Sequence, residues 1–248
     1  MDAPRTKTPL QALIFDVDGT LADTEAAHRA AFNQAFADAG LEWVWDETLY
    51  IELLDVTGGK ERILHYWKRL QPDLGGASAS TAAEWIDRLH ASKTTAYCRL
   101  VQDGSVPLRP GVQQLLHTAH RQGIPCAIAT TTTRANVDAL LLATLGPAWQ
   151  QYFAVIEDAS TAPLKKPHPQ VYLQALERLG LPAHACLAFE DSANGLAAAR
   201  GAGLATVVTP NRYTQHHVFT GALRELPGLQ DCALADLQAW HAGEAVLA

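Results

Sequence analysis

A run of apolar residues that ends in two acids constrains this chain more than any other stretch of its sequence. Residues 13–15 are Leu-Ile-Phe, Asp16 and Asp18 follow, and Gly19 comes next. Consecutive apolar residues are typical of a strand buried in a parallel sheet, and glycine tolerates the dihedral angles of a tight turn that ends it. Because ligands bind beyond the carboxyl ends of such strands, the two acids are predicted to lie at a ligand site.

The spacing of the two acids allows two interpretations. If the strand continues to Asp18, the carboxylates of Asp16 and Asp18 point the same way, because side chains alternate along a strand. Two adjacent carboxylates repel each other, which is tolerable if a cation lies between them or if one keeps its proton. The alternative is a turn whose aspartates only cap the next element.

Strand and helix patterns alternate in the second part of the chain. Short apolar strands are predicted at residues 125–129, 153–156, 185–189 and 206–208, and amphipathic helices are predicted between them. This alternation is typical of an α/β protein with a doubly wound parallel sheet, which is the fold class that we expect.

The region between the first predicted strand and about residue 103 shows only helical patterns. Its first helix, for which Thr24 is the expected N-cap, is predicted to end at Gly40. Because this block is inserted directly after the acids of the first strand, we expect it to lie over them as a lid. The predicted domains are an α/β core of residues 1–24 and 104–248 and an all-helical cap of residues 25–103.

Composition and charge narrow the class of protein. The 248 residues are 48% hydrophobic and 18% charged, which is typical of a globular protein, and no apolar run reaches membrane-spanning length. The net charge of −7 argues against nucleic acid as the main partner. The four cysteines show no CxxC spacing, and Met1–Pro9 shows no targeting pattern, so we expect a cytoplasmic protein with reduced thiols.

Polar residues also follow the other predicted strands. Thr130 follows the second strand, Lys166 lies on a loop after the third, and Glu190 and Asp191 follow the fourth. These residues should meet the acids of the first strand in one crevice. Carboxylates can hold Mg²⁺, and lysine and threonine suit phosphate oxygens. A metal together with an aspartate nucleophile is the chemistry of aspartyl-phosphate formation.

Taken in order, these motifs resemble those of the haloacid dehalogenase superfamily, in its phosphatase branch. Asp-x-Asp-Gly-Thr at 16–20 is similar to the first motif, Thr130 to the second, Lys166 before Pro167 to the third, and Glu190-Asp191 to the fourth. The resemblance covers essentially the whole chain. It is closer still to the CbbY group, through residues 24–28, 57–62, 129–133 and 189–195.

The resemblance implies a role for each motif. Asp16 would attack phosphorus, and Asp18 would first donate a proton to the leaving oxygen and then accept one from water. Thr130 and Lys166 would bind the oxygens of the transferred phosphate. The expected cofactor is Mg²⁺, and its implied ligands are the Asp16 carboxylate, the Asp18 backbone carbonyl, Asp191 and, through water, Glu190.

The CbbY group removes one phosphate from xylulose 1,5-bisphosphate, a by-product that inhibits Rubisco, so the resemblance implies a role beside the Calvin cycle. Residues 57–99 carry seven Lys and Arg against four Asp and Glu, which suits a substrate with a second phosphate. The expected substrate-binding residues are Glu25, His28, Lys60, Arg62, Thr131, Thr132 and Arg134. We expect a monomer with a small-molecule sugar phosphate as substrate, and neither nucleic acid nor a membrane as partner.

Other functions stay open on the sequence. A β-phosphoglucomutase-type sugar phosphomutase would share every motif, and a broad phosphoglycolate-type phosphatase would share the core motifs. A dehalogenase would need neither the acid pair for Mg²⁺ nor a proton-donating Asp18, so these residues argue against it. The intact core motifs also argue against a non-catalytic, ligand-sensing relative.

Overall fold

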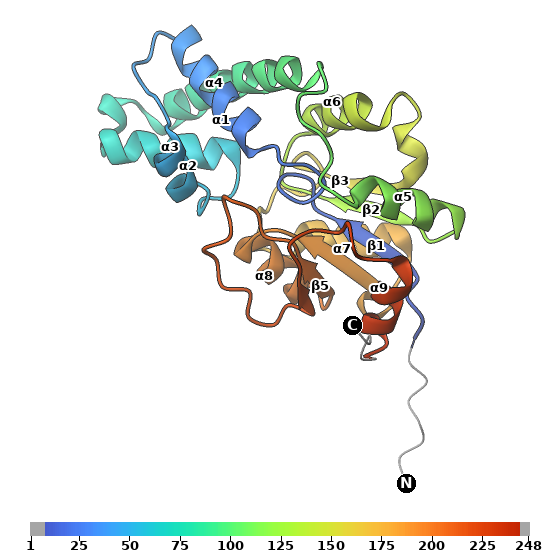
Figure 1. Cartoon of the computed structure of the whole chain (residues 1–248). Coiled ribbons are helices and arrows are strands. Elements are labelled where there is room, and N and C mark those ends of the chain that lie inside the picture. Colours follow the sequence, from blue (N-terminus) through green and yellow to red (C-terminus); the bar gives the residue numbers. More distant parts are fainter. Residues whose placement is uncertain (1–7, 244–248) are drawn as a thin grey trace.

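The computed structural model describes residues 8–243, so most of the Met1–Pro9 stretch lies outside the described residues. Its centre is one six-stranded sheet in which all neighbouring strands are parallel, in the spatial order β3-β2-β1-β4-β5-β6 (Figure 1). The strand order reverses between β1 and β4, which is where ligands bind in sheets of this kind. The strands are β1 (Ala12–Phe15), β2 (Cys126–Ala129), β3 (Phe153–Glu157), β4 (Cys186–Glu190), β5 (Ala205–Val208) and β6 (Arg224–Glu225).

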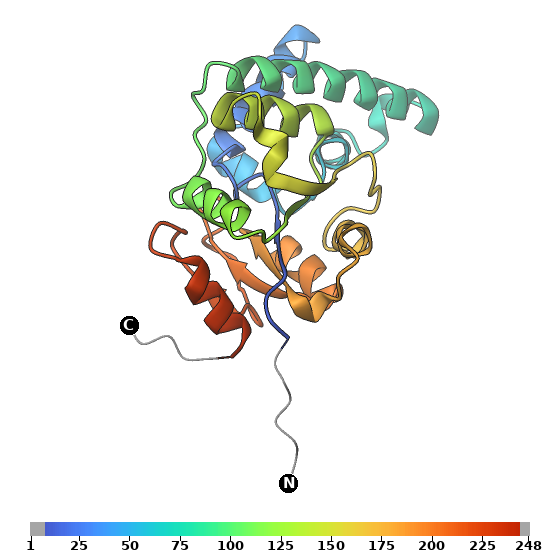
Figure 2. The ribbon, with the colours of Figure 1, turned by 90° about the vertical axis from the view of Figure 1, so that its right-hand side faces the viewer.

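Helices cover both faces of the sheet, so the predicted doubly wound α/β fold is confirmed (Figure 2). Apolar side chains of α5, α6 and α9 share a buried cluster with Leu13 and Phe15, and those of α7 and α8 share another with Ile14. Because side chains alternate along β1, its residues contribute to the hydrophobic core on each face of the sheet. These helices are α5 (Val112–Arg121), α6 (Arg134–Leu145), α7 (Gln170–Leu179), α8 (Ala193–Gly201) and α9 (Leu234–His241).

Four α-helices and one short 3-10 helix (Leu74–Gly76) lie between β1 and α5, and they form the helical segment (residues 25–101). The α-helices are α1 (Glu25–Asp38), α2 (Glu47–Leu53), α3 (Gly59–Leu70) and α4 (Ala79–Val101). They pack around an aromatic cluster of their own that includes Phe32, Trp45 and Tyr50. The chain enters and leaves this segment through adjacent stretches of backbone, because Ala22 pairs with Leu108. The predicted helical insertion is therefore present.

The structure settles one open question and corrects one local prediction. Strand β1 ends at Phe15 and does not continue to Asp18, so the alternation of a strand does not align the two acids. Thr24 is the N-cap of α1 by position, but its hydroxyl makes no capping bond and donates to Asp18 instead. The short strand β6 and helix α9 were not predicted, because neither has a periodic pattern long enough to read. No helix within residues 8–243 is both long and apolar enough to cross a membrane.

Candidate active site

Three buried carboxylates converge where the strand order reverses. Asp16 follows β1, Glu190 ends β4 and Asp191 follows it, because β1 and β4 are paired in register from Ala12 with Cys186 to Phe15 with Phe189. One oxygen from each carboxylate lies within 4.8 Å of the others. The sequence predicted this convergence, since parallel strands end at the same edge of a sheet.

Lys166 holds two of these carboxylates together. Its Nζ donates to Asp16 Oδ1 at 2.7 Å and to Glu190 Oε1 at 2.6 Å, and the lysine is 4% exposed. Glu190 Oε1 also accepts a hydrogen bond from the Tyr172 hydroxyl at 2.5 Å. A Cβ at Gly195 would overlap the Glu190 carboxylate, so a glycine is needed above it. Glu190 is thus fully buried and committed to Lys166 and Tyr172.

The charges of this cluster do not balance. Burial, opposed by the charge of Lys166 and assisted by that of Glu190, raises the pKa of Asp16 from 3.8 to about 7. Burial and the charges of Asp16 and Glu190 also raise the pKa of Asp191 well above its ordinary value. One ammonium group thus faces three carboxylates. A set of oxygen donors with excess negative charge fits a hard divalent cation such as Mg²⁺.

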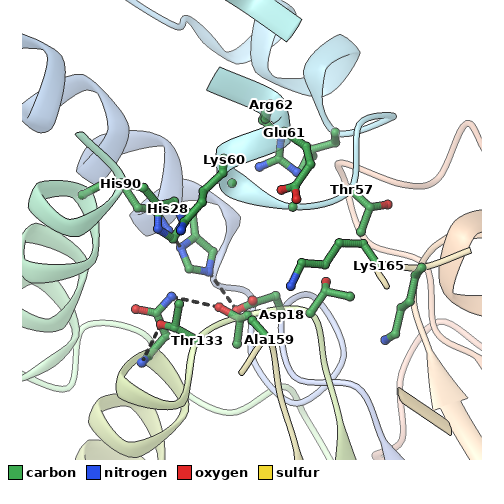
Figure 3. A pocket seen from close by; sticks show the side chains of 18 of the residues that line it. Asp18, His28, Thr57, Lys60, Glu61, Arg62, His90, Thr133, Ala159 and Lys165 are labelled. Carbon is green, nitrogen blue, oxygen red and sulfur yellow. Dashed lines mark hydrogen bonds and ion pairs between the residues drawn. The ribbon is translucent and has the colours of Figure 1, made fainter. Parts of the chain in front are cut away.

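Asp18 has different partners from Asp16. Its Oδ1 accepts a hydrogen bond from Thr24 Oγ1 at 2.7 Å and lies 2.9 Å from His28 Nε2, as the dashed line in Figure 3 shows. Burial alone would raise the pKa of Asp18, but the electrostatic attraction of the His28 ring, the hydrogen bonds from His28 and Thr24 and the nearby charge of Lys93 outweigh it and hold the pKa well below its ordinary value. The surroundings therefore shift the pKa values of these two neighbouring acids in opposite directions: the pKa of Asp16 is raised and that of Asp18 is lowered.

Lys93, which was not predicted from the sequence, completes a chain of contacts to Asp18. Its Nζ lies 2.7 Å from His28 Nδ1, and the His28 ring stacks on Tyr97. An ammonium group can only donate, so Nδ1 accepts and His28 Nε2 carries the proton that faces Asp18. Burial lowers the pKa of Lys93 to about 8. Its spacing from Ile86, Leu89 and Tyr97 on the buried face of α4 was a signal that could have revealed it.

The acids open into a cavity of about 670 Å³ that lies between the sheet and the helical segment. This volume is in the range of small-molecule sites. Figure 3 shows Thr57, Glu61 and Arg62 on one wall and Asp18 and Thr133 on the other. Basic residues on the cavity lining come from both parts of the chain: Lys60, Arg62, Lys93, Arg134, Lys165 and Lys166.

The predicted substrate-binding residues of the helical segment all line this cavity, but their freedom differs. Lys60 is half-exposed and forms an ion pair with Asp87 at 2.7 Å, which leaves it able to turn to another anion. Arg62 is buried, and its guanidinium donates to the carbonyl oxygens of Leu53 and Val56 and to the Tyr50 hydroxyl. Arg62 thus supports the wall of the cavity.

Glu25 and His28 also form hydrogen bonds within the protein. The Glu25 carboxylate accepts a hydrogen bond from the Tyr50 hydroxyl at 2.8 Å. Both ring nitrogens of His28 already have partners, Asp18 and Lys93. Neither nitrogen is therefore free to bind a ligand in this structure. A direct contact of His28 with substrate stays a prediction.

The loop after β2 places its threonines unequally. Thr131 and Thr132 line the cavity, whereas Thr130 is buried and its Oγ1 accepts a hydrogen bond from the Thr132 N–H at 3.3 Å. Arg134 lines the cavity at the start of α6 and forms an ion pair with Asp138 at 2.7 Å. The structure thus brings the whole predicted set to one place, with Thr130 and Glu190 behind the surface of the cavity.

Lys165 and His90 are further lining residues that were not predicted from the sequence. Lys165 directly precedes Lys166, and burial lowers its pKa. Burial and the nearby charges of Lys93 and Lys60 lower the pKa of His90 to about 3, so this imidazole is neutral. The doubled lysine was a signal for Lys165, whereas nothing in the sequence distinguished His90 from a surface histidine.

Comparison with known proteins identifies the family of the chain. The family model of the haloacid dehalogenase-like hydrolases matches residues 10–203. The plasmid-encoded protein CbbY of Cupriavidus necator is 54% identical, and the match covers 94% of this chain and 98% of that protein. The crystal structure of CbbY from Rhodobacter sphaeroides with phosphate has a TM-score of 0.85 at 43% identity and covers 92% of this chain and 99% of that one. An aspartate-to-asparagine mutant of the same protein, solved with xylulose 1,5-bisphosphate, has a TM-score of 0.84 at 42% identity, with the same coverage.

Proposed function

The chain belongs to the haloacid dehalogenase-like hydrolase family, within its CbbY group, and is a sugar-phosphate phosphatase; we propose that it removes one phosphate from xylulose 1,5-bisphosphate through a phosphoaspartate at Asp16. The observation that carries this proposal is the buried cluster of Asp16, Lys166, Glu190 and Asp191 beneath a cavity with basic walls. The similarity to a protein solved with that bisphosphate supports the choice of substrate.

Asp16 is the nucleophile in this proposal. The hydrogen bond from Lys166 fixes its carboxylate in place. The side chain therefore loses less conformational entropy when it attacks phosphorus. Lys166 stays charged in its buried position, because Asp16 and Glu190 raise its pKa against the effect of burial. The ammonium group can therefore neutralise charge on the transferring phosphate.

Asp18 is the general acid and then the general base. The contacts with Thr24 and His28 stabilise its carboxylate form, so it must lose part of this support before it can carry a proton to the leaving oxygen. Thr24 precedes α1 and His28 lies on it. The protonation of Asp18 thus depends on where the helical segment sits, which we propose acts as a cap of residues 25–103 over a core of residues 1–24 and 104–248.

Mg²⁺ would be held by the Asp16 carboxylate, the Asp18 backbone carbonyl and Asp191, with Glu190 behind them. When bound, the cation neutralises charge between the nucleophile and the phosphate. In the metal-free protein a proton bound to the Asp16 carboxylate neutralises this charge instead, because the pKa of Asp16 is raised to about 7. A cytoplasmic location and a monomeric state stay predictions.

This proton has a consequence for stability. The pKa of Asp16 is about 7 in the folded protein and 3.8 in an unfolded chain, so between these pH values the folded state binds the extra proton. The free energy of unfolding of metal-free protein is therefore expected to fall as the pH rises from about 4 to about 7. A cation replaces the proton, so the melting-temperature increase caused by MgCl₂ should be larger near pH 8 than near pH 5. Equal increases at both pH values would contradict a cation at Asp16.

The substrate is tested by removing a basic side chain from the cavity wall. A charge-assisted hydrogen bond to phosphate contributes roughly 1.5–3 kcal/mol, so Lys60→Ala is expected to lower kcat/KM on the bisphosphate by about 10- to 150-fold. Hydrolysis of p-nitrophenyl phosphate, which has no second phosphate, should change much less. Lys68→Ala is the matched control, because Lys68 is exposed on the same helix and does not line the cavity.

The same assay separates the alternatives. Equal losses on both substrates, or wild-type turnover of monophosphates as fast as that of the bisphosphate, would favour a broad phosphatase. Turnover that needs a bisphosphate activator and releases no phosphate would identify a phosphomutase.

A further inference from the structure

The loop that follows β5, residues 209–217, contacts both the helical segment and the acid cluster; we call it the latch loop. We propose that the latch loop couples the position of the helical segment to the orientation of Asp191, with Tyr213 and Asn211 as positioning residues. The inference rests on the proposed function in one respect, which is that Asp191 is a metal ligand.

Tyr213 anchors the latch loop in the helical segment. The residue is 5% exposed, and it belongs to the aromatic cluster that includes Phe32, Trp45 and Tyr50. The other buried members of this cluster all come from residues 32–89, so Tyr213 is its one contribution from the rest of the described chain. Its ring is perpendicular to that of Tyr50 at a centroid distance of 6.2 Å. A buried aromatic contact of this kind fixes position more firmly than a polar surface contact.

Two residues earlier, Asn211 holds the acid cluster. Its Nδ2 donates to Asp191 Oδ2 at 2.7 Å, while its Oδ1 accepts from the Tyr213 N–H at 2.8 Å. Thr214 makes a longer contact, 3.5 Å, from its Oγ1 to the same Asp191 oxygen. Because both side chains reach one carboxylate oxygen, the latch loop sets the rotation of the Asp191 carboxylate.

The pair formed by Asn211 and Asp191 also packs against the loop that carries the predicted acid and base. A Cβ at Gly19 would overlap both Asp191 Oδ2 and Asn211 Nδ2, and Gly19 has a φ of +79°. The guanidinium of Arg109, 8% exposed, donates to the carbonyl oxygens of Gly19 and Thr209 and so joins the two loops. A shift of the latch loop therefore cannot leave Asp191 unaffected.

The other contacts between the latch loop and the helical segment each have at least one exposed partner. Arg212 forms an exposed ion pair with Glu47, and Nε2 of His217, whose side chain is 13% exposed, lies 3.8 Å from Oδ1 of the exposed Asp55. Ion pairs that reach solvent stabilise a structure little. Tyr213 thus carries the coupling, and Arg212 supplies a neighbouring control.

Coupling between two sites is reciprocal. If docking of Tyr213 orients Asp191, then a change at Tyr213 must weaken metal binding although Tyr213 contacts no acid of the cluster, and metal binding must in turn stabilise the helical segment. A latch loop that is only structural would show neither effect.

The test measures metal affinity directly. Mn²⁺ serves as the probe for the Mg²⁺ site, its free concentration is followed by electron paramagnetic resonance, and Mg²⁺ is measured by competition. Tyr213→Leu is expected to weaken Mn²⁺ binding by at least about 5-fold, the lower end of typical coupling between linked sites. Tyr213→Phe should bind as the wild type does, because the Tyr213 hydroxyl is buried without a hydrogen-bond partner among the described residues. Arg212→Ala should also leave the affinity unchanged.

The double variant tests the route of the coupling. Asn211→Ala should weaken Mn²⁺ binding, and adding Tyr213→Leu should weaken it by less than Tyr213→Leu does alone, because Tyr213 acts mainly through Asn211 and only the longer contact of Thr214 remains. Wild-type affinity in Tyr213→Leu, or independent and additive effects of the two changes, would overturn the proposal.

Hydrogen exchange gives a second readout, which does not depend on Tyr213→Leu folding. In the wild type, saturation with Mg²⁺ is expected to slow exchange of the amides in α2, and Asn211→Ala should abolish this dependence. Exchange of α2 that is indifferent to Mg²⁺ in the wild type would count against the coupling. A wild type that binds Mn²⁺ without hydrolysing sugar bisphosphates would contradict the proposed substrate and leave the coupling standing.

Discussion

Replacement of Asp16 by asparagine is expected to abolish covalent incorporation of phosphate and to lower kcat by roughly 10⁴-fold or more, the scale of loss when a covalent nucleophile is removed. The physical reason is local: the carboxylate of Asp16 lies at the end of β1 against Lys166, whereas a carboxamide oxygen in the same place carries no charge with which to attack phosphorus. Incorporation is measured by mass spectrometry of the intact protein after rapid quenching.

The fold should survive this change, which makes the experiment decisive. Lys166 keeps its contact with Glu190 at 2.6 Å, so its charge is not left unpaired in the interior. Asp23→Asn is a matched control, since Asp23 precedes α1 with a side chain that is 64% exposed and does not line the cavity. Phosphate bound covalently to Asp16→Asn would show that another residue is the nucleophile.

Replacement of Asp18 by asparagine is expected to separate the two halves of the reaction. General acid and base catalysis contributes about 10²- to 10⁴-fold, so hydrolysis of a sugar phosphate should fall by that factor. With a good leaving group such as p-nitrophenolate, which needs no proton, the variant should still transfer phosphate to Asp16. The burst of p-nitrophenolate, measured by stopped-flow absorbance, should then equal one per protein and be followed by slow turnover.

The contacts of Asp18 support this separation. In the Asp18→Asn variant the carboxamide oxygen can still accept a hydrogen bond from Thr24, so the turn should keep its shape. What is lost is the proton exchange that His28 and Lys93 influence. Loss of the burst as well as of turnover would assign Asp18 a part in the first chemical step beyond proton donation.

The sequence predicted the arrangement of the core because each element carries its own pattern. Apolar strands at 13–15, 125–129, 153–156 and 185–189 lie within the observed sheet or extend one residue beyond a strand, and the polar residues after them meet at one edge. This argument needs only the rule that parallel strands end together. It left the direction of the Asp18 side chain open, because that direction depended on whether β1 continues beyond Phe15, and the strand ends there.

The residues of the helical segment were harder to place. Arg62 follows a Gly-Gly turn as an anion-binding residue would, yet its guanidinium is occupied by carbonyl groups of its own segment. Lys93 and His28 are 65 positions apart and meet only because α1 and α4 pack together. Asn211 lies in no recognisable motif, and its proposed role is visible only from its hydrogen bond to the Asp191 carboxylate.

The sequence by itself determined the parallel sheet, the helical insertion and the positions of Asp16, Lys166 and Asp191, because strand periodicity and strand ends are local properties of the chain. Only the tertiary structure decided which partner each charged group has: Lys166 with Glu190, His28 with Lys93. The reason is physical. The partner of a side chain, and hence its pKa and its freedom to bind a ligand, depends on how distant segments pack, and no periodicity along the chain records that packing.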